Sequence, residues 1–231
     1  GRRARTVAEI RSTDAGWRAD LPLRVSRWGG PVLALPSGEY RVEVDGREVA
    51  TDLEAFPRTR GATVSIEVAG GRVAVGPPLG PAESTREGQG ALERAYARSR
   101  GPLENAVFFE SFYGRNASCN PRAIDAEIAR VAPGVTRYWS VVDHSVVVPD
   151  GAIAVVEGSS EWWRARAVAR LLVVNDWLRR RFVRRPGQRV LQTWHGTPLK
   201  RLALHRPGFD LRRALAVVRE SRRWDVLLAQ N

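Results

Sequence analysis

The sequence predicts an α/β protein with a Rossmann-like parallel sheet, preceded by a small all-β domain. Two stretches in the first 80 residues alternate apolar and polar side chains around tight-turn residues, which is typical of β-hairpins. From residue 105 onward, short apolar runs alternate with helical stretches, as in parallel strands joined by crossover helices. We therefore expect a β-rich accessory domain at 1–80, a linker at 81–104 and a Rossmann-like domain at 105–231.

The β-rich part contains two predicted hairpins. Residues 38–51 alternate around Asp45-Gly46, and residues 62–76 alternate around Gly70-Gly71. Both pairs favour two-residue turns with positive φ. Because no cluster of catalytic residue types lies in this part, we expect it to have an accessory role.

The next segment, residues 76–90, is rich in Pro, Gly and polar residues and has the composition of a linker. A short helix is expected after it, over 91–100.

In the Rossmann-like part, apolar runs have the length and continuity of strands that are covered on both faces. They span residues 106–112, 136–142, 152–158, 171–176, 189–194 and 225–230. Helices are expected at 120–131, 160–170 and 209–224. The first of these helices has Asn120 as its expected N-cap and Pro121 at its first position. Functional loops are expected at the carboxyl ends of the strands.

The net charge of +12 is concentrated in the second half of the chain. Residues 164–206 hold 12 basic side chains and one acidic side chain, Asp176. A polyanion, a phosphorylated substrate or an anionic membrane surface would complement this region, and a solvated basic face is the alternative.

A single cysteine, Cys119, excludes an internal disulfide and fits a reducing cytoplasm. No apolar run is long enough for a membrane-spanning helix, and the Arg-rich beginning of the chain lacks the apolar stretch of a signal peptide. Since the chain starts at Gly1 and contains no methionine, we expect it to be an excerpt of a longer protein, with a processed chain as the alternative.

The stretch QTWHGTPLK, residues 192–200, holds the strongest candidate site. His195 and Gly196 are expected in the loop after a strand, and Thr197 with the following proline is expected to open a helix. Lys200, the only lysine, would then oppose the helix dipole unless a bound phosphate lies there. A histidine beside that phosphate can accept a proton near neutral pH. The alternative is that His195 only caps the strand and Lys200 reaches into solvent.

A second candidate loop, FFESFYGRNASCNPRAI, also follows a predicted strand. Glu110, Arg115 and Asn116 are its candidate substrate- or phosphate-binding residues, and Ser111 and Tyr113 could bind an acceptor hydroxyl or phosphate. Glu110 could equally be a structural partner for a nearby arginine.

A third stretch, DWLRRRFVRRPGQR, mixes aromatic and basic side chains. This composition fits the interface of an anionic membrane, and it also fits nucleic acid or a plain Arg-rich surface helix. The candidate contacts are Trp177, Arg179, Arg180, Arg181, Phe182, Arg184 and Arg185.

Several motifs are missing from the sequence: a phosphate loop, a dinucleotide fingerprint, a nucleophile elbow and metal-ligand spacing. We therefore expect no cofactor and no metal.

Four segments, in this order, resemble the CDP-glycerol glycerophosphotransferase family, which comprises teichoic-acid primases and polymerases. They read ESFYGRNASCNPRAI, WSVVDHSVVVPDGAIAVVEGSSEWW, RRPGQRVLQTWHGTPLKRL and WDVLLAQN. The resemblance covers residues 104–231, and QTWHGTPLK is its most specific part.

The resemblance implies the N-terminal half of a glycosyltransferase-B-like enzyme, with the C-terminal half and its donor-site residues absent from this sequence. It implies transfer of glycerol phosphate or ribitol phosphate from CDP-glycerol or CDP-ribitol to a hydroxyl of a polyprenyl-diphosphate-linked or polymeric acceptor. The product would be a teichoic-acid-like cell-wall or capsule polymer, made by a peripheral enzyme on the cytoplasmic face of the cell membrane. His195 matches the proposed general base, and we expect this segment alone to be inactive.

The chain departs from the family pattern at Cys119, where an acidic residue is common.

Two other function classes remain open from the sequence. One is a non-catalytic module that docks the acceptor or the membrane, for which loss of the His195 side chain would leave transfer intact. The other is a basic nucleic-acid-binding domain, which is not expected and would bind arbitrary DNA at physiological salt.

Overall fold

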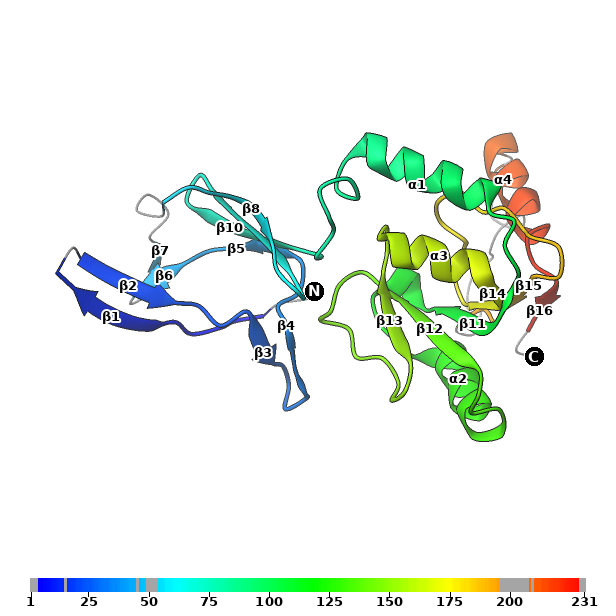
Figure 1. Cartoon of the computed structure of the whole chain (residues 1–231), viewed down its shortest axis with the longest axis horizontal. Coiled ribbons are helices and arrows are strands. Elements are labelled where there is room, and N and C mark those ends of the chain that lie inside the picture. Colours follow the sequence, from blue (N-terminus) through cyan, green and yellow to red (C-terminus); the bar gives the residue numbers. More distant parts are fainter. Residues whose placement is uncertain are drawn as a thin grey trace. The chain divides into compact units, whose positions relative to one another are not determined.

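The structure, a computed structural model, describes residues 4–14, 16–44, 46–48, 54–195, 208 and 210–228. The chain divides into two compact units (Figure 1). Unit 1 consists of Gly1–Ser84 with Val142–Val147, and unit 2 consists of Thr85–Val141 with Val148–Asn231.

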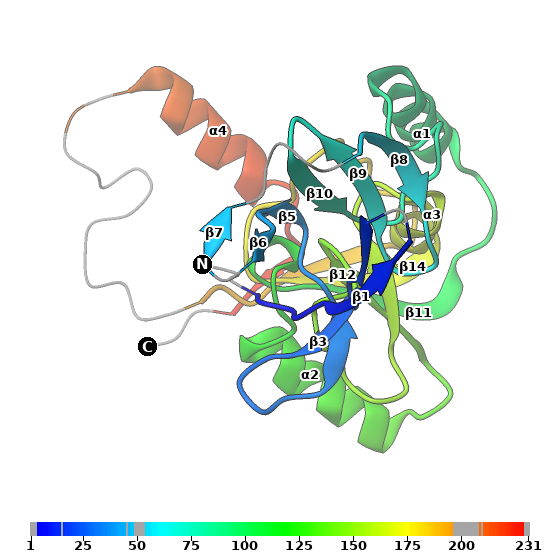
Figure 2. The same ribbon diagram turned by 90° about the vertical axis from the view of Figure 1, so that its left-hand side faces the viewer.

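Unit 1 is built from short antiparallel strands (Figure 2). Its largest sheet has the order β5-β10-β9-β8, and two-stranded pairs are formed by β1-β2, β3-β4 and β6-β7. The strands are β1 (Glu9–Thr13), β2 (Gly16–Asp20), β3 (Arg24–Ser26), β4 (Val32–Ala34), β5 (Gly38–Tyr40), β6 (Glu43–Val44), β7 (Arg47–Glu48), β8 (Phe56–Arg60), β9 (Ser65–Ala69) and β10 (Arg72–Gly76).

Both predicted hairpins of unit 1 are present. Strands β9 and β10 pair through Ala69 and Arg72 around Gly70 and Gly71, whose φ angles are 57° and 72°. Two successive positive φ angles define the type I′ turn that the right-handed twist of paired strands favours. Strands β6 and β7 pair around residues 45–46, of which Asp45 lies outside the described residues.

Within the segment expected as a linker, 81–104, the short helix expected over 91–100 is present as α1 (Arg86–Arg98), which begins five residues earlier. The helix begins where the Thr85 side chain accepts a hydrogen bond from the backbone N–H of Gly88, at 3.0 Å. Its Tyr96 ring packs 5.2 Å from the Trp163 ring of α3 (Ser160–Val168). This tertiary contact, together with the cap, overrides the low helix propensity of the glycines in the first turns.

Unit 2 contains the predicted Rossmann-like sheet, and all of its strand pairs are parallel. The strands are β11 (Glu104–Glu110), β12 (Thr136–Val141), β13 (Ile153–Val156), β14 (Ala169–Val174), β15 (Arg189–Gln192) and β16 (Val226–Leu227). Their spatial order is β13-β12-β11-β14-β15-β16. This is the doubly wound order, in which the direction of winding reverses between β11 and β14, and ligands bind at the carboxyl edge beside such a reversal.

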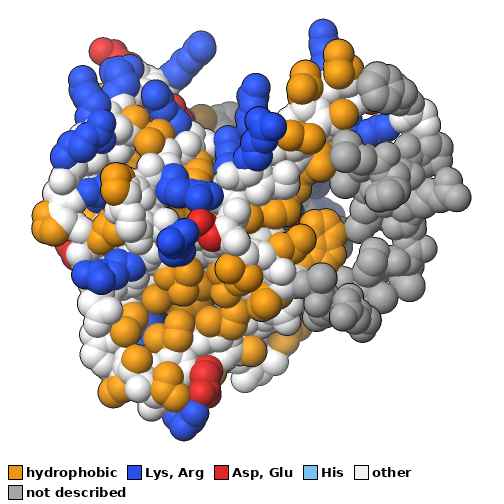
Figure 3. All heavy atoms as spheres, turned by 90° about the vertical axis from the view of Figure 1, so that its right-hand side faces the viewer, with side chains coloured by type: hydrophobic (Ala, Val, Ile, Leu, Met, Phe, Trp, Pro, Cys, Tyr) orange, Lys and Arg blue, Asp and Glu red, His pale blue; other side chains and the backbone are white. Residues whose placement is uncertain are grey.

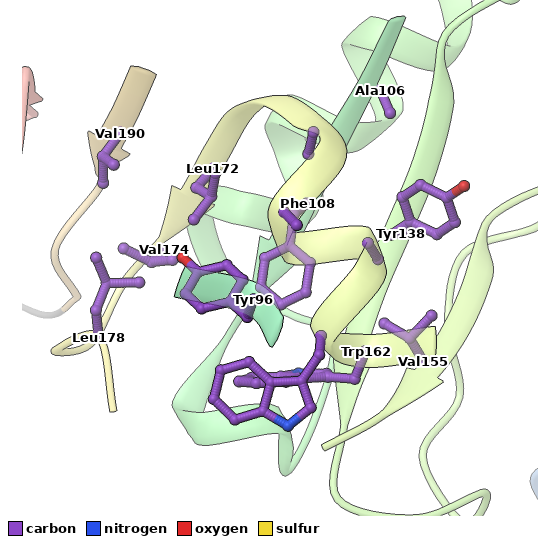
Figure 4. Packing of buried hydrophobic residues seen from close by; sticks show 14 residues of the cluster. Tyr96, Ala106, Phe108, Tyr138, Val155, Trp162, Leu172, Val174, Leu178 and Val190 are labelled. Carbon is purple, nitrogen blue, oxygen red and sulfur yellow. The ribbon is translucent and has the colours of Figure 1, made fainter. Parts of the chain in front are cut away.

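Helices cover both faces of this sheet (Figure 1). Helices α1 and α3 lie on one face, and α2 (Cys119–Val131) lies on the other; α4 (Leu211–Ser221) precedes β16. Adjacent residues of β11 show why its sequence is continuously apolar. Phe108 packs against Trp162 of α3 in the cluster drawn in Figure 4, whereas Phe109 stacks on Trp139 at 5.1 Å in the α2-facing cluster.

No helix within the described ranges is long and apolar enough to cross a membrane.

Candidate functional site

The site lies where loops leave the carboxyl edge of the sheet at its switch point. The loop after β11 and the loop after β14 are joined by Asn175, which is fully buried. Its side-chain oxygen accepts from the backbone N–H of Phe112 at 2.9 Å, and its amide nitrogen donates to the hydroxyl of Ser111 at 3.2 Å. One buried amide therefore ties together the two loops on either side of the switch point.

His195 follows β15 and lies against a residue at the start of the loop that follows the neighbouring strand β14. Its Nε2 is 3.2 Å from Oδ1 of Asp176, which comes two residues after β14. The His195 side chain is 36% exposed and that of Asp176 is 15% exposed. The imidazole is thus paired with a carboxylate and still open to a substrate.

Two aromatic rings hold the imidazole in place. The Trp194 ring stacks nearly parallel to it, at 5.6 Å and 12°, and the Phe112 ring lies at 5.1 Å and 54°. Because Phe112 comes from the loop after β11, the imidazole contacts all three loops of the site.

Two amide side chains fix the backbone around His195. The Gln192 side chain, which is fully buried, donates to the carbonyl oxygen of Asp176 and accepts from the backbone N–H of Trp194, both at 2.9 Å. Asn120 donates to the carbonyl oxygen of Thr193 at 3.0 Å. The segment before His195 is therefore held from both sides.

Left-handed backbone is concentrated at this edge of the sheet. Of the non-glycine residues described with positive φ, all except Trp28 lie here: Phe112, Tyr113, Cys119, Arg180 and Trp194. Such conformations cost roughly 1–3 kcal/mol each and persist where the surrounding structure imposes them, often at functional sites.

Tyr113 and Arg179 border the His195–Asp176 pair. The guanidinium of Arg179 lies 4.3 Å from the centre of the Tyr113 ring and donates to the Tyr113 carbonyl oxygen at 3.0 Å. Burial, and then the negative charge of Asp176, raises the pKa of the Tyr113 hydroxyl. The tyrosine is therefore a neutral hydrogen-bonding group beside the carboxylate.

Arg115 and Asn116 are exposed and belong to the same loop as Phe112. The Asn116 side-chain oxygen accepts from the Ser118 hydroxyl at 2.7 Å, which orders the end of this loop. Their predicted contact with substrate stays a prediction.

Glu110 is placed differently from the other predicted site residues. Its side chain lies in the α3-facing interior, is 5% exposed and accepts from the Ser140 hydroxyl at 2.8 Å. Ser140 in turn accepts from the indole N–H of Trp162 at 2.8 Å. Burial raises the pKa of Glu110, although the positive charge of Arg166 opposes this effect. These contacts favour the structural alternative for Glu110 over substrate binding.

Gly196, Thr197 and Lys200 lie outside the described residues. The phosphate-binding role predicted for them stays a prediction.

The Arg-rich stretch at 176–189 is not a helix, and most of its cations have internal partners. Arg179 and Arg180 pair with Glu157 at 2.9 and 2.8 Å, and Arg184 pairs with Asp225 at 2.9 Å.

For Arg185 the expected surface contact is wrong, because the side chain is buried, whereas Phe182 is partly buried. Arg185 is 8% exposed and donates to the carbonyl oxygens of Ala167 and Gly101, and Phe182 packs against the α3-facing core. Trp177 and Arg181 are exposed, as a surface contact requires. Figure 3 shows Arg side chains next to exposed hydrophobic ones on one face of the molecule.

The sequence alone did not identify Asp176, Gln192 or Asn120 as site residues. Asp176 carried a usable signal, because it is the one acidic residue in the basic stretch 164–206. Asn120 was expected to cap a helix, but α2 begins at Cys119 with Ser118 at its N-cap position. The Asn120 side chain is used across the site instead, which no local pattern reveals.

Comparison with known proteins places this site in context. The family model for CDP-glycerol:poly(glycerophosphate) glycerophosphotransferase matches residues 95–231, which is more than half of the chain. A teichoic acid poly(glycerol phosphate) polymerase of Bacillus subtilis (strain 168) is 37% identical over 142 residues, covering 58% of this chain and 19% of that protein. A teichoic acid glycerol-phosphate transferase of Staphylococcus aureus is 30% identical over 156 residues, covering 58% of this chain and 36% of that protein.

The structure resembles that of the wall teichoic acid polymerase TagF, with a TM-score of 0.54 and 30% identity over 62% of this chain and 37% of that one. A TagF variant soaked with CDPG gives the same score and identity over 60% of this chain. The chain therefore spans well under half the length of these relatives. Since the family model covers β11 to β16 and every loop of the site, the chain belongs to the CDP-glycerol:poly(glycerophosphate) glycerophosphotransferase family.

Proposed function

We propose that the whole protein transfers glycerol phosphate from CDP-glycerol to a hydroxyl of a lipid-linked acceptor or growing polymer, in the synthesis of a teichoic-acid-like polymer. Membership of the family and the names of the relatives support this activity. The observation that carries it is the His195–Asp176 pair at the switch point of the sheet, in which the imidazole is partly exposed to solvent.

The chemistry of this transfer needs a base and a cationic environment for phosphate. The acceptor oxygen attacks the β-phosphorus of CDP-glycerol, the bond from that phosphorus to the bridging oxygen breaks, and CMP leaves with the electron pair. The proton of the acceptor hydroxyl passes to His195, and Asp176 then faces the positive charge of the imidazolium. Lys200 and the backbone amides near Thr197 are proposed to bind the phosphoryl oxygens.

Two finer parts of the proposal concern the partners. The acceptor is proposed to be polyprenyl-diphosphate-linked or polymeric, and the protein is proposed to bind peripherally to the anionic cytoplasmic face of the membrane. The exposed Trp177 and Arg181 support this binding, because an indole and a guanidinium suit the headgroup region. CDP-ribitol is the competing donor.

The test uses the protein expressed from its whole reading frame, CDP-glycerol and a synthetic lipid-linked acceptor, with CMP release as the readout. We expect His195→Ala to lower the rate about 10²–10⁴-fold, which is the usual contribution of a general base. Arg130→Ala, exposed on α2, is the control and should leave the rate unchanged. Transfer that survives His195→Ala would support the docking-module alternative. A faster reaction with CDP-ribitol than with CDP-glycerol would show that CDP-ribitol is the donor.

A further inference from the structure

We propose that Asp176 and Gln192 are positioning residues for His195, and that they make Nδ1 the imidazole nitrogen that receives the proton. This inference rests on the proposed function for its catalytic meaning. The geometry that carries it is independent of any activity.

The contact with Asp176 distinguishes the two imidazole nitrogens of His195. Nε2 of His195 faces Oδ1 of Asp176 at 3.2 Å. An ionised carboxylate only accepts hydrogen bonds, so in the neutral ring Nε2 must carry the hydrogen. Nδ1 is then the nitrogen with a free lone pair, and a base needs that lone pair.

The Gln192 side chain links the loop that carries Asp176 to the loop that carries His195. Gln192 ends β15, and its amide joins the carbonyl oxygen of Asp176 to the backbone N–H of Trp194. Only one orientation of the amide satisfies both partners, because its nitrogen must face the carbonyl and its oxygen must face the N–H. A single buried side chain therefore sets the position of Asp176 relative to the residue before His195.

Trp194 adopts a φ of 54°, and its ring stacks on the imidazole with 5.6 Å between ring centres. A left-handed conformation is unfavourable for a bulky side chain. The hydrogen bond from its N–H to Gln192 stabilises this conformation. The strained residue and the buried amide together orient the ring, whereas a simple surface ion pair needs neither.

In the reaction, the O–H bond of the acceptor breaks, and the oxygen forms its new bond to the β-phosphorus while CMP departs. Nδ1 takes the proton. His195 becomes a cation with hydrogens on both nitrogens, and the Nε2 hydrogen stays directed at the Asp176 carboxylate. The carboxylate is not protonated at any point.

A double-mutant cycle in the protein expressed from its whole reading frame tests the positioning role. We expect Asp176→Ala to lower kcat for CMP release about 100-fold with little change in KM for CDP-glycerol. In the His195→Ala background the same change should alter kcat less than twofold, because Asp176 acts only through the histidine. An equal loss in both backgrounds would show that Asp176 acts by itself and would overturn the proposal.

A spectroscopic test keeps the inference separate from the proposed function. In protein labelled with ¹⁵N-histidine, at a pH where the ring is neutral, His195 should show a protonated Nε2 and an unprotonated Nδ1. Gln192→Met, which removes both amide contacts at similar volume, should mix the two tautomers, and Arg130→Ala on the exposed face of α2 should not. A proton on Nδ1 in the unmodified protein would refute the assignment, even if His195 proved essential for transfer. If His195→Ala kept full transfer, the proposed function would fail while the tautomer result still stood.

Discussion

Asn120, in the first turn of α2, donates from its side-chain nitrogen to the carbonyl oxygen of Thr193, 3.0 Å away. The same nitrogen lies 3.5 Å from the carbonyl oxygen of Trp194. This contact joins a helix to the loop of His195 across 73 residues of sequence. The position of the His195 imidazole therefore depends on a residue of the helix that follows β11, on the other side of the switch point from β15.

We predict that Asn120→Ala lowers transfer about tenfold, because a misplaced base reduces the fraction of productive complexes. The change also leaves the Thr193 carbonyl without its side-chain donor, which should lower the free energy of unfolding by about 1–2 kcal/mol. Steady-state kinetics and urea denaturation measure the two effects. Arg122→Ala, exposed in the same helix, is the control, and equal kinetics for both variants would contradict the prediction.

We predict that Gly114→Ala lowers the free energy of unfolding by about 2–4 kcal/mol. Gly114 has a φ of 71°, and an added Cβ would come within 3.2 Å of the Ser140 carbonyl oxygen and of the Val141 backbone. Neither backbone atom can move without disturbing β12. Gly134→Ala meets nothing within 4 Å and should cost much less in the same denaturant titration. A similar cost at both glycines would argue against close packing at Gly114.

We predict that Glu110→Gln reduces the pH dependence of stability. Burial raises the pKa of Glu110 in the folded state above its value in the unfolded chain. The stability that this residue contributes is therefore fully present below the unfolded pKa, which is ordinarily 4.5, and is lost as the pH rises through the raised folded pKa. Denaturant titrations across this range should show a smaller fall for Glu110→Gln than for the unmodified protein. A parallel fall in both proteins would show that Glu110 ionises without cost.

We predict that Asp125→Ala is among the most destabilising single changes, at about 3–5 kcal/mol. Asp125 is fully buried, accepts from Arg137 at 2.9 Å and accepts from the indole N–H of Trp139 at 3.1 Å. Its loss leaves the guanidinium of Arg137, 9% exposed, without its carboxylate partner.

The double variant Asp125→Ala with Arg137→Met should recover part of this loss, because no unpaired charge then remains buried. Thermal denaturation of the unmodified protein, Asp125→Ala, Arg137→Met and the double variant measures the coupling. If the double variant lost more free energy of unfolding than the two single variants lose together, this account would be contradicted.

The central strands of the Rossmann-like sheet were predictable because they are covered on both faces. Phe108 and Phe109 are neighbours in β11 and point into different cores. Because both faces of the strand must be apolar, the strand is a continuous apolar run in the sequence. The turn at Gly70-Gly71 was predictable because only residues that tolerate two positive φ angles suit it. Only the later part of helix α1 was expected as a helix and its first residues were expected as linker, because the packing of Tyr96 on Trp163, a contact between distant segments, is not visible in the local sequence.

The sequence by itself determined the order of strands and helices, the family, and the loop in which His195 lies. These follow from local patterns: period, turn residues and a specific motif. Only the tertiary structure decided that Asp176, Gln192 and Asn120 surround His195, that Glu110 turns into the core, and that Arg185 is buried. The physical reason is that parallel strands bring their carboxyl ends to one edge whatever their separation in the chain, so the partners of a side chain there are set by sheet order.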